Sequence, residues 1–165
     1  MKKDNRIRFI CNSAIVAALY VVLTYLTNIF GLASGPIQCR LSEAMCVLPS
    51  FIPSAVPGLF AGCLLSNVFT GCNVFDIVFG SIATLVGAYG THFLSKRSVT
   101  HFLYPVPTII ANTVIIPFVL KYTYGFEGGL LYFFLTVGAG EIISCGILGI
   151  VLYYSLKKSG KFLHD

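Results

Sequence analysis

Long apolar runs, separated by short polar or turn-forming stretches, make up most of this chain. A membrane-spanning helix needs about 20 mainly apolar residues, and the longest runs reach that length. Pro53 and Pro57 predict a tight turn between two shorter runs, because proline cannot continue a preceding helix. Gly71-Cys72-Asn73 predicts another turn. The pattern therefore predicts six spanning segments, at residues 9–30, 41–52, 57–70, 74–94, 102–120 and 130–156.

Four of these segments carry complications. Segments 41–52 and 57–70 are short for a complete crossing, so we expect them to be tilted or buried within the bundle. Three prolines, Pro105, Pro107 and Pro117, are expected to bend segment 102–120 or to trim its ends. The first run follows basic residues as a signal peptide would. Its apolar stretch of about 22 residues exceeds the roughly 7–15 of a signal core, so we interpret it as a span.

Composition agrees with a membrane protein. Of 165 residues, 56% are hydrophobic and only 10% are charged, with a mean hydropathy of +0.86. A soluble domain of this size carries about 25% charged residues, so most of this chain has too few polar side chains to face water. We predict an all-α membrane protein: a single domain over residues 1–165, built as a bundle of six transmembrane helices with no room for a soluble domain.

The basic residues gather at positions that favour one orientation. The net charge is +5, but the cations form no basic face of the kind that binds nucleic acid. With six spans and a cytoplasmic N-terminus, nine of the eleven cations lie inside and only Arg40 and Lys121 lie outside. This is the positive-inside bias of membrane loops. We therefore expect both termini to be cytoplasmic and no nucleic-acid partner.

Several polar residues interrupt the apolar runs. An ionisable residue within a span costs roughly 2.5–3.5 kcal/mol on insertion scales, which makes it a candidate for function. Glu141 is the clearest case, near Gly138, Gly140 and Gly146. Each such residue has a structural alternative: a bond to a neighbouring helix for Glu141, helix pairing for Asn112 and Asn67, and helix capping for Asn73 and Asp76.

The stretch GPIQCRLSEAMCVLPSF, residues 35–51, brings polar side chains to the edge of the apolar region. Arg40 and Glu43 are one helical turn apart and can pair. The alternative is that they close the mouth of a pocket, with Gln38 offering a donor and an acceptor. Gln38, Arg40, Glu43, Asn67 and Asp76 all map near the outer leaflet, and Glu141 and Asn112 lie deeper. This grouping predicts a polar pocket that opens to the outside, with walls of Phe and Tyr.

Small residues and cysteines give weaker signals. Ala14 and Ala18, like Gly58 and Gly62, are four residues apart, a spacing that permits close helix packing either within the bundle or against another membrane subunit. The six cysteines are scattered without C-x-x-C or ligand spacing. We expect them to behave as small buried apolar residues, and we expect no zinc site. The sequence does not decide whether Cys39 and Cys72 form a disulfide.

Motifs of catalysis are absent from the sequence. It contains no G-x-x-x-x-G-K-[ST], no H-E-x-x-H and no G-x-S-x-G. The chain therefore does not hydrolyse ATP through a P-loop, and an enzyme is not expected.

The run GPIQCRLSEAMCVLP, followed by PSAVPGLFAGCLLSNVF and DIVFGSIATL, resembles the QueT family of queuosine-precursor transporters. The resemblance extends over roughly residues 9–156. These proteins are substrate-binding S components of energy-coupling factor (ECF) transporters. The resemblance implies a six-helix protein of the bacterial plasma membrane that captures a 7-deazaguanine from outside: the aminomethyl form, the cyano form or queuine. The loop between the first two spans would be the gate.

The resemblance also implies partners. An ATPase pair and a transmembrane coupling subunit would supply the work, so ATP is used by the partner ATPases and this chain needs no cofactor. Ala14 and Ala18 would then dock onto the coupling subunit. Position 39 is Cys where the family pattern leads us to expect an aromatic residue, which leaves the precursor undecided and includes queuine.

The predicted chemistry and the resemblance meet at Glu141. The guanine-like edge of a deazaguanine presents two adjacent N–H donors, and a carboxylate can accept both in a strong bidentate pair. Asn67 or Asn112 would bind the ring carbonyl, and Asp76 or Glu43 would hold an aminomethyl cation. Two other functions stay open: a stand-alone secondary transporter or channel for a small polar solute, and a structural membrane subunit without a ligand.

Overall fold

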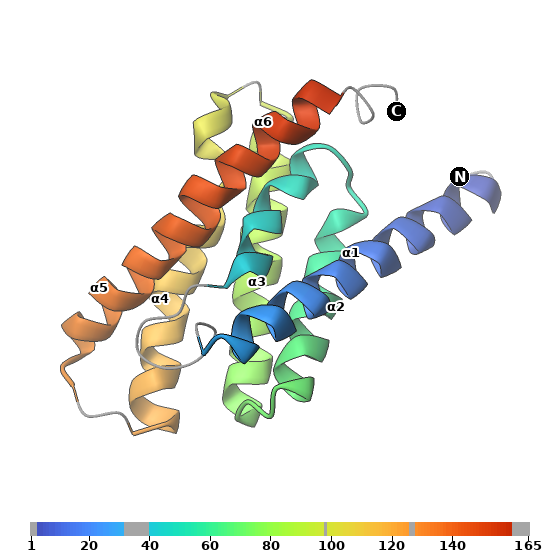
Figure 1. The fold of residues 1–165 in the computed structure, drawn as a ribbon. Coiled ribbons are helices and arrows are strands. Elements are labelled where there is room, and N and C mark those ends of the chain that lie inside the picture. Colours follow the sequence, from blue (N-terminus) through green and yellow to red (C-terminus); the bar gives the residue numbers. More distant parts are fainter. Residues whose placement is uncertain (1–2, 32–39, 98, 126–127, 160–165) are drawn as a thin grey trace.

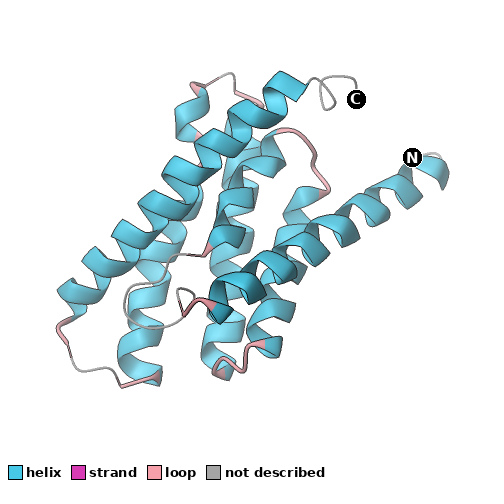
Figure 2. Cartoon of the chain, viewed as in Figure 1, coloured by secondary structure: helices cyan, strands magenta, loops and turns pink. Residues whose placement is uncertain are grey.

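The computed structural model describes residues 3–31, 40–97, 99–125 and 128–159, and every regular element in these ranges is helical (Figure 2). The elements in chain order are α1 (Lys3–Ile29), η1 (Leu41–Ser50), α2 (Ala55–Phe69), α3 (Val74–Ser95), η2 (His101–Leu103), α4 (Val106–Thr123), α5 (Leu130–Glu141), η3 (Ile142–Leu148) and α6 (Gly149–Ser159). The predicted all-α class is confirmed.

The long elements run alternately up and down, so that the first turns of α1 and the last turns of α6 lie at the same end of the molecule (Figure 1). Neighbours in the chain pack together as α1 with α2, α2 with α3, α3 with α4 and α4 with α5. Residues 130–159 form one continuous apolar helix made of α5, η3 and α6. This antiparallel order places η1 in the middle of the bundle, in contact with α1, α2, α3, η3 and α6.

Four helices are long and apolar enough to cross a membrane, at Asp4–Ile29, Val74–Ser95, His101–Thr123 and Leu130–Ser159. Helix α2 has 15 residues and extends about 22 Å at 1.5 Å per residue. Element η1 has ten residues and extends about 20 Å at 2.0 Å per residue. Both are shorter than the ~30 Å hydrocarbon core. The two segments expected to be short are therefore short, and η1 is buried among the longer helices.

Turn chemistry sets several of the boundaries. Gly31 and Gly71 have φ angles of 70° and 73°, which glycine adopts without strain, and they follow the ends of α1 and α2. The Asn73 side chain accepts from the Phe75 N–H at 3.2 Å and caps α3, so the structural alternative for Asn73 is confirmed. Pro105 precedes the first residue of α4, and Pro117 lies inside that helix. The expected trimming by Pro105 is observed.

Glycines allow α1 and α2 to approach closely. A Cβ atom at Gly58 would lie 2.7 Å from the Ser13 carbonyl oxygen, and one at Gly62 would lie 2.7 Å from Tyr20 Cβ. The G-x-x-x-G spacing of α2 therefore serves packing within the bundle. Ala14 and Ala18 are exposed on α1, so the spacing on that helix leaves a small-residue face uncovered.

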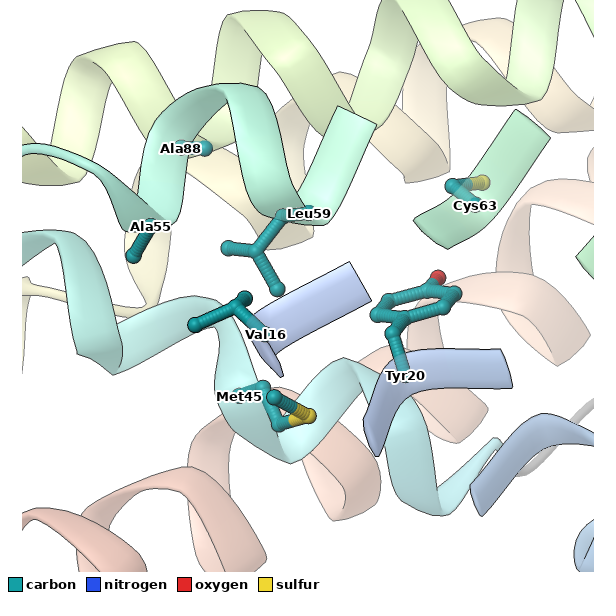
Figure 3. Close-up of a cluster of buried hydrophobic side chains, with 7 residues drawn as sticks. All are labelled: Val16, Tyr20, Met45, Ala55, Leu59, Cys63 and Ala88. Carbon is teal, nitrogen blue, oxygen red and sulfur yellow. The ribbon is translucent and has the colours of Figure 1, made fainter. Parts of the chain in front are cut away.

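The core that this packing creates joins four elements. Figure 3 shows seven buried side chains converging from α1, η1, α2 and α3: Val16, Tyr20, Met45, Ala55, Leu59, Cys63 and Ala88. Tyr20 is fully buried here, and its hydroxyl reaches the polar site described below. The apolar core and the polar site thus share the side chains of Tyr20 and Cys63, which fixes their relative position.

Candidate substrate-binding site

A small polar cavity lies inside the bundle, in the half remote from the two termini. It is lined by residues of η1, α2, α3, α4 and α5: Arg40 at the N-cap of η1, then Glu43, Cys63, Gly80, Thr84, Asn112, Ile116, Val137 and Glu141. Six of the seven residues predicted for the site lie in the described part of the chain, and four of them line this cavity directly. The arrangement places one guanidinium and two carboxylates in a space walled off by helices.

Glu43 occupies the first turn of η1 and is buried. Its carboxylate accepts a hydrogen bond from the Tyr20 hydroxyl of α1. The neighbouring Ser42 hydroxyl accepts from Thr24 Oγ1 at 2.8 Å, which ties the same turn to α1 a second time. The η1 segment ends near Pro49, and its i to i+3 bonding places Glu43 toward the centre of the bundle. Glu43 is thus held from one side by α1.

Glu141 enters the cavity from the opposite side, at the end of α5. Its Oε1 accepts from Asn112 Nδ2 at 2.9 Å, and its Oε2 accepts from Cys145 Sγ at 3.1 Å. The Cys145 thiol also lies 3.4 Å from the Glu43 carbonyl oxygen. Cys145 belongs to η3, a π-helical stretch that begins immediately after Glu141, and such stretches occur frequently at functional sites.

A second layer of polar groups closes the outer end. Arg40 Nη1 donates to Asn67 Oδ1 at 3.1 Å, and Asn67 Nδ2 lies 3.4 Å from the Asp76 carbonyl oxygen. The Asp76 carboxylate accepts from the Tyr124 hydroxyl at 3.1 Å, and that hydroxyl accepts from the Asn73 N–H at 3.1 Å. Partial burial, together with the Asp76 carboxylate, raises the pKa of Tyr124 to about 12. This layer links η1 and α2 to the start of α3 and the end of α4.

The predicted site residues fall into three groups. Arg40, Glu43, Asn112 and Glu141 line the cavity together. Asn67 contacts Arg40 behind the lining, and Asp76 lies in the outer layer with Tyr124. Gln38 lies outside the described residues, as do Cys39 and most of the predicted gate. The outer grouping inferred from the sequence therefore divides into an inner lining and an outer brace.

Several contributors were not predicted. Tyr20, Cys63, Gly80, Thr84 and Cys145 bond to or line the site. Each is small or amphipathic and looks unremarkable in an apolar run, so only the three-dimensional packing shows its role. The spacing of Glu141 and Cys145, four residues apart in one helix, was the one available signal.

The expected aromatic walls differ from what lines this cavity. Among the described lining residues, the apolar surfaces come from Ile116 and Val137, together with Gly80. Tyr20 lies behind Glu43 and presents its hydroxyl. A flat ring would therefore rest against branched aliphatic side chains rather than between aromatic faces.

The cavity is tight. The space that it encloses amounts to about 20 Å³, enough for one water molecule. A bicyclic base is several times larger, so its binding requires side chains to move apart.

A metal ion is a second chemical option for the same residues. Glu43, Glu141 and Cys145 each offer one atom that could bind a metal ion, and these three atoms lie within 4.8 Å of one another. These carboxylate oxygens already accept hydrogen bonds from Tyr20, Asn112 and Cys145. The donor set therefore fits hydrogen-bond recognition of a ligand that carries N–H groups, since such a ligand can replace these donors without a change in charge.

The fold and the site define a class of protein: a multi-pass helical membrane protein that encloses a polar cavity between its helices. The chain belongs to the QueT transporter family, whose model matches residues 10–158. This family is one of transporters, in agreement with the sequence predictions of a multi-pass membrane protein and of no enzyme.

One curated relative supports the same family. The chain is 36% identical over 84 residues to a protein named queuosine precursor transporter QueT from Lactococcus lactis subsp. cremoris (strain MG1363). The alignment covers 51% of this chain and 49% of that protein, so it spans about half the length of the relative. No solved structure matches the chain.

Proposed function

We propose that this protein is the substrate-binding S component of an ECF-type importer and that it captures a 7-deazaguanine precursor of queuosine from outside the cell. The observation that carries the proposal is the pairing of Glu141 with Asn112 and of Glu43 with Tyr20 around one cavity that also contains Arg40. Buried acids and amides are costly in a membrane, and a ligand of matching polarity offsets that cost.

The ligand pose follows from the donors and acceptors. Glu141 accepts the two N–H groups of the guanine-like edge, which replace the bonds from Asn112 and Cys145. The released Asn112 amide and the Arg40 guanidinium then donate to the ring carbonyl. A site built on such pairs rejects an analogue without the donors by roughly 10⁴–10⁵-fold, because its own buried groups are left unpaired.

The charges favour a cationic substituent on the ring. Two carboxylates, Glu43 and Glu141, line the cavity with one guanidinium, Arg40. One negative charge is therefore left over when all three are ionised, and atoms of Glu43 and Glu141 lie within 4.8 Å of each other, so a cationic group beside Glu43 would be close to both carboxylates. An aminomethyl group at this position balances the charge, whereas a cyano group does not. Queuine also carries an amine, and the tight cavity favours the smaller aminomethyl form.

The partners of an S component follow from the same proposal. A transmembrane coupling subunit and an ATPase pair would hydrolyse ATP and drive uptake, and the exposed Ala14 and Ala18 face would receive the coupling subunit. Small residues permit the close approach that such docking needs.

A titration of the purified protein in detergent tests the ligand. Intrinsic tyrosine fluorescence or calorimetry would be followed with four compounds: the aminomethyl deazaguanine, the cyano form, queuine and adenine. We expect the aminomethyl form to bind most tightly and adenine not to bind. Equal affinity for adenine would contradict the hydrogen-bond pattern.

Transport in proteoliposomes tests the assembly separately. We expect uptake only when the coupling subunit and ATPases are co-reconstituted with ATP. Uptake by this chain alone would instead indicate a secondary transporter or channel, without affecting the assignment of the ligand.

A further inference from the structure

Two cavities open along α1 in the half of the molecule that holds the termini, one between α1 and α6 and the other between α1 and the turn before α2. Helices α1 and α6 diverge toward their terminal ends, with η1 between them (Figure 1). One cavity, of about 490 Å³, is an apolar groove, and the other, of about 510 Å³, has polar groups in its lining. Asn12 and Ile52 line both, so the two spaces adjoin. Neither includes a residue of the candidate substrate-binding site.

The linings of the two cavities match the two parts of a phospholipid, with polar side chains where a headgroup would lie and apolar side chains where an acyl chain would lie. Nearer the N-terminus of α1, the lining carries Asn5, Arg8 and Asn12, with Ser54 from the turn before α2. Further along α1, the groove is lined by Ile15 and other aliphatic side chains. Polar groups thus stand at the membrane surface and apolar ones at membrane depth.

One face of α1 carries both parts. Residues 5, 8, 12, 15 and 19 recur at intervals of three or four, so they lie along one side of the helix. Leu152 and Leu156 of α6 line the other wall of the groove. Ile15, Leu19 and Val22 are each more than half exposed, so the protein itself leaves this face uncovered.

The charge of the polar end is basic. Arg8 is exposed, and within the described residues no ion pair joins it to an acid, although Asp4 lies one turn earlier. By the distribution of cations, this end faces the cytoplasm, where anionic lipids attract Lys and Arg. Asn5, Asn12 and Ser54 supply neutral donors around the same space.

We propose that this composite groove binds one anionic phospholipid of the cytoplasmic leaflet. Arg8 binds the phosphate, the neighbouring amides bind the headgroup, and one acyl chain lies against Ile15, Leu19 and Leu152. Ala14 and Ala18 lie roughly 120° further around α1 at 100° per residue, so the lipid leaves the small-residue face open. The lipid would brace α1 against α6, which otherwise diverge.

Native mass spectrometry of the full chain tests the proposal. The protein is delipidated in detergent and offered equal amounts of dioleoyl phosphatidylglycerol and dioleoyl phosphatidylcholine, which share their acyl chains. We expect one retained lipid, with phosphatidylglycerol preferred about fivefold, the effect of one basic residue near an anionic headgroup. Arg8→Gln should abolish the preference, and Leu19→Trp, which fills the groove, should lower the retention of both lipids.

Arg6→Gln is the matched control, because it removes the same charge from α1 at a position that lines neither cavity. It should keep the preference. Equal retention of the two lipids by the unchanged protein, or equal loss in the Arg6 and Arg8 variants, would overturn the proposal. Retention of a second copy of the chain in place of the lipid would also overturn it. If Leu19→Trp does not fold, the comparison of Arg6 with Arg8 decides.

Discussion

Asn112 Nδ2 donates to Glu141 Oε1 at 2.9 Å, which joins α4 to the end of α5 at the centre of the candidate site. Both residues are polar groups within apolar helices, and each satisfies the other. Both carboxylate oxygens of Glu141 therefore already accept hydrogen bonds within the protein. A ligand must offer at least as many hydrogen bonds as Asn112 and Cys145 already provide.

Glu141→Gln should therefore separate binding from stability. The amide can still accept from Asn112, but it cannot accept two N–H groups as a carboxylate does, so we expect deazaguanine affinity to fall by about 100-fold for two charge-assisted bonds. The thermal midpoint should change by only a few degrees, since a buried charge is removed. Titration and thermal unfolding of the same preparation measure both.

Asp4→Asn is the control for that substitution, because it makes the same chemical change in the first turn of α1, remote from the cavity. Its affinity should match the unchanged protein. An unaltered affinity in Glu141→Gln would remove Glu141 from the site, whatever the stability.

The helix contact behind the site gives a second prediction. A Cβ at Gly62 would lie 2.7 Å from Tyr20 Cβ and 3.1 Å from the Ala17 backbone, so Gly62→Ala must push α1 away from α2. Overpacking of this kind costs about 1–3 kcal/mol. Because Tyr20 donates to Glu43, ligand affinity should fall together with stability. Denaturant or thermal unfolding in detergent checks the first effect and titration the second.

Gly146→Ala offers the comparison. It is also a glycine inside a helical segment, but the nearest atoms to its added Cβ are side-chain carbons at 3.8 Å, an ordinary contact. It should leave stability within about 0.5 kcal/mol, as neutral substitutions do. Similar losses in both variants would show that glycine flexibility, rather than the α1–α2 contact, matters.

The outer layer predicts a pH effect. The pKa of Tyr124 is raised to about 12 by partial burial and by the Asp76 carboxylate, above the ordinary value near 10. A group whose pKa is higher in the folded than in the unfolded protein stabilises the folded state fully at pH values below its unfolded pKa. For Tyr124 this stabilisation is lost as the pH rises from about 10 to 12. Thermal midpoints measured at pH 9 and pH 11.5 should therefore fall more in the unchanged protein than in Tyr124→Phe.

The difference in the fall of the thermal midpoint between the two proteins reports on Tyr124 alone, because the other tyrosines titrate in both. At pH 9 the Tyr124→Phe protein should be the less stable one, because its side chain no longer bonds Asp76 and the Asn73 N–H. Parallel pH curves would show that this bridge contributes nothing to the folded state.

Much of the fold follows from the sequence because the hydrophobic pattern is strong. Long runs such as 74–94 predict spans by their length and apolar character, and Val74–Ser95 is one helix long and apolar enough to cross a membrane. The conformation of η1 could not be predicted, because a short, mainly apolar stretch such as 41–50 does not distinguish an α-helix from a 3₁₀-helix. Its conformation depends on burial among five neighbouring elements, which no local pattern encodes.

Some residues of the candidate site could likewise be predicted from the sequence and others could not. Glu141 and Asn112 could be predicted because a polar side chain in an apolar run is conspicuous, and the structure brings them into contact. Tyr20, Thr84 and Cys145 could not, because Tyr, Thr and Cys are common in membrane helices without any function. Their contribution comes from the side on which each helix packs, and that is a property of the assembled bundle.

Arg40 gives the last prediction. Its Nη1 donates to Asn67 Oδ1 at 3.1 Å while the residue lines the cavity, so the planar guanidinium can hold Asn67 and a ring carbonyl at the same time. Lysine keeps the charge but has no such fork, so Arg40→Lys should weaken deazaguanine binding by about tenfold, the effect of losing one hydrogen bond to a charged group. Lys121→Gln removes the other cation assigned to the outer side and should leave binding unchanged. A loss in Lys121→Gln equal to that in Arg40→Lys would mean that general attraction by outer charge, and not the geometry at Arg40, governs capture of the ligand.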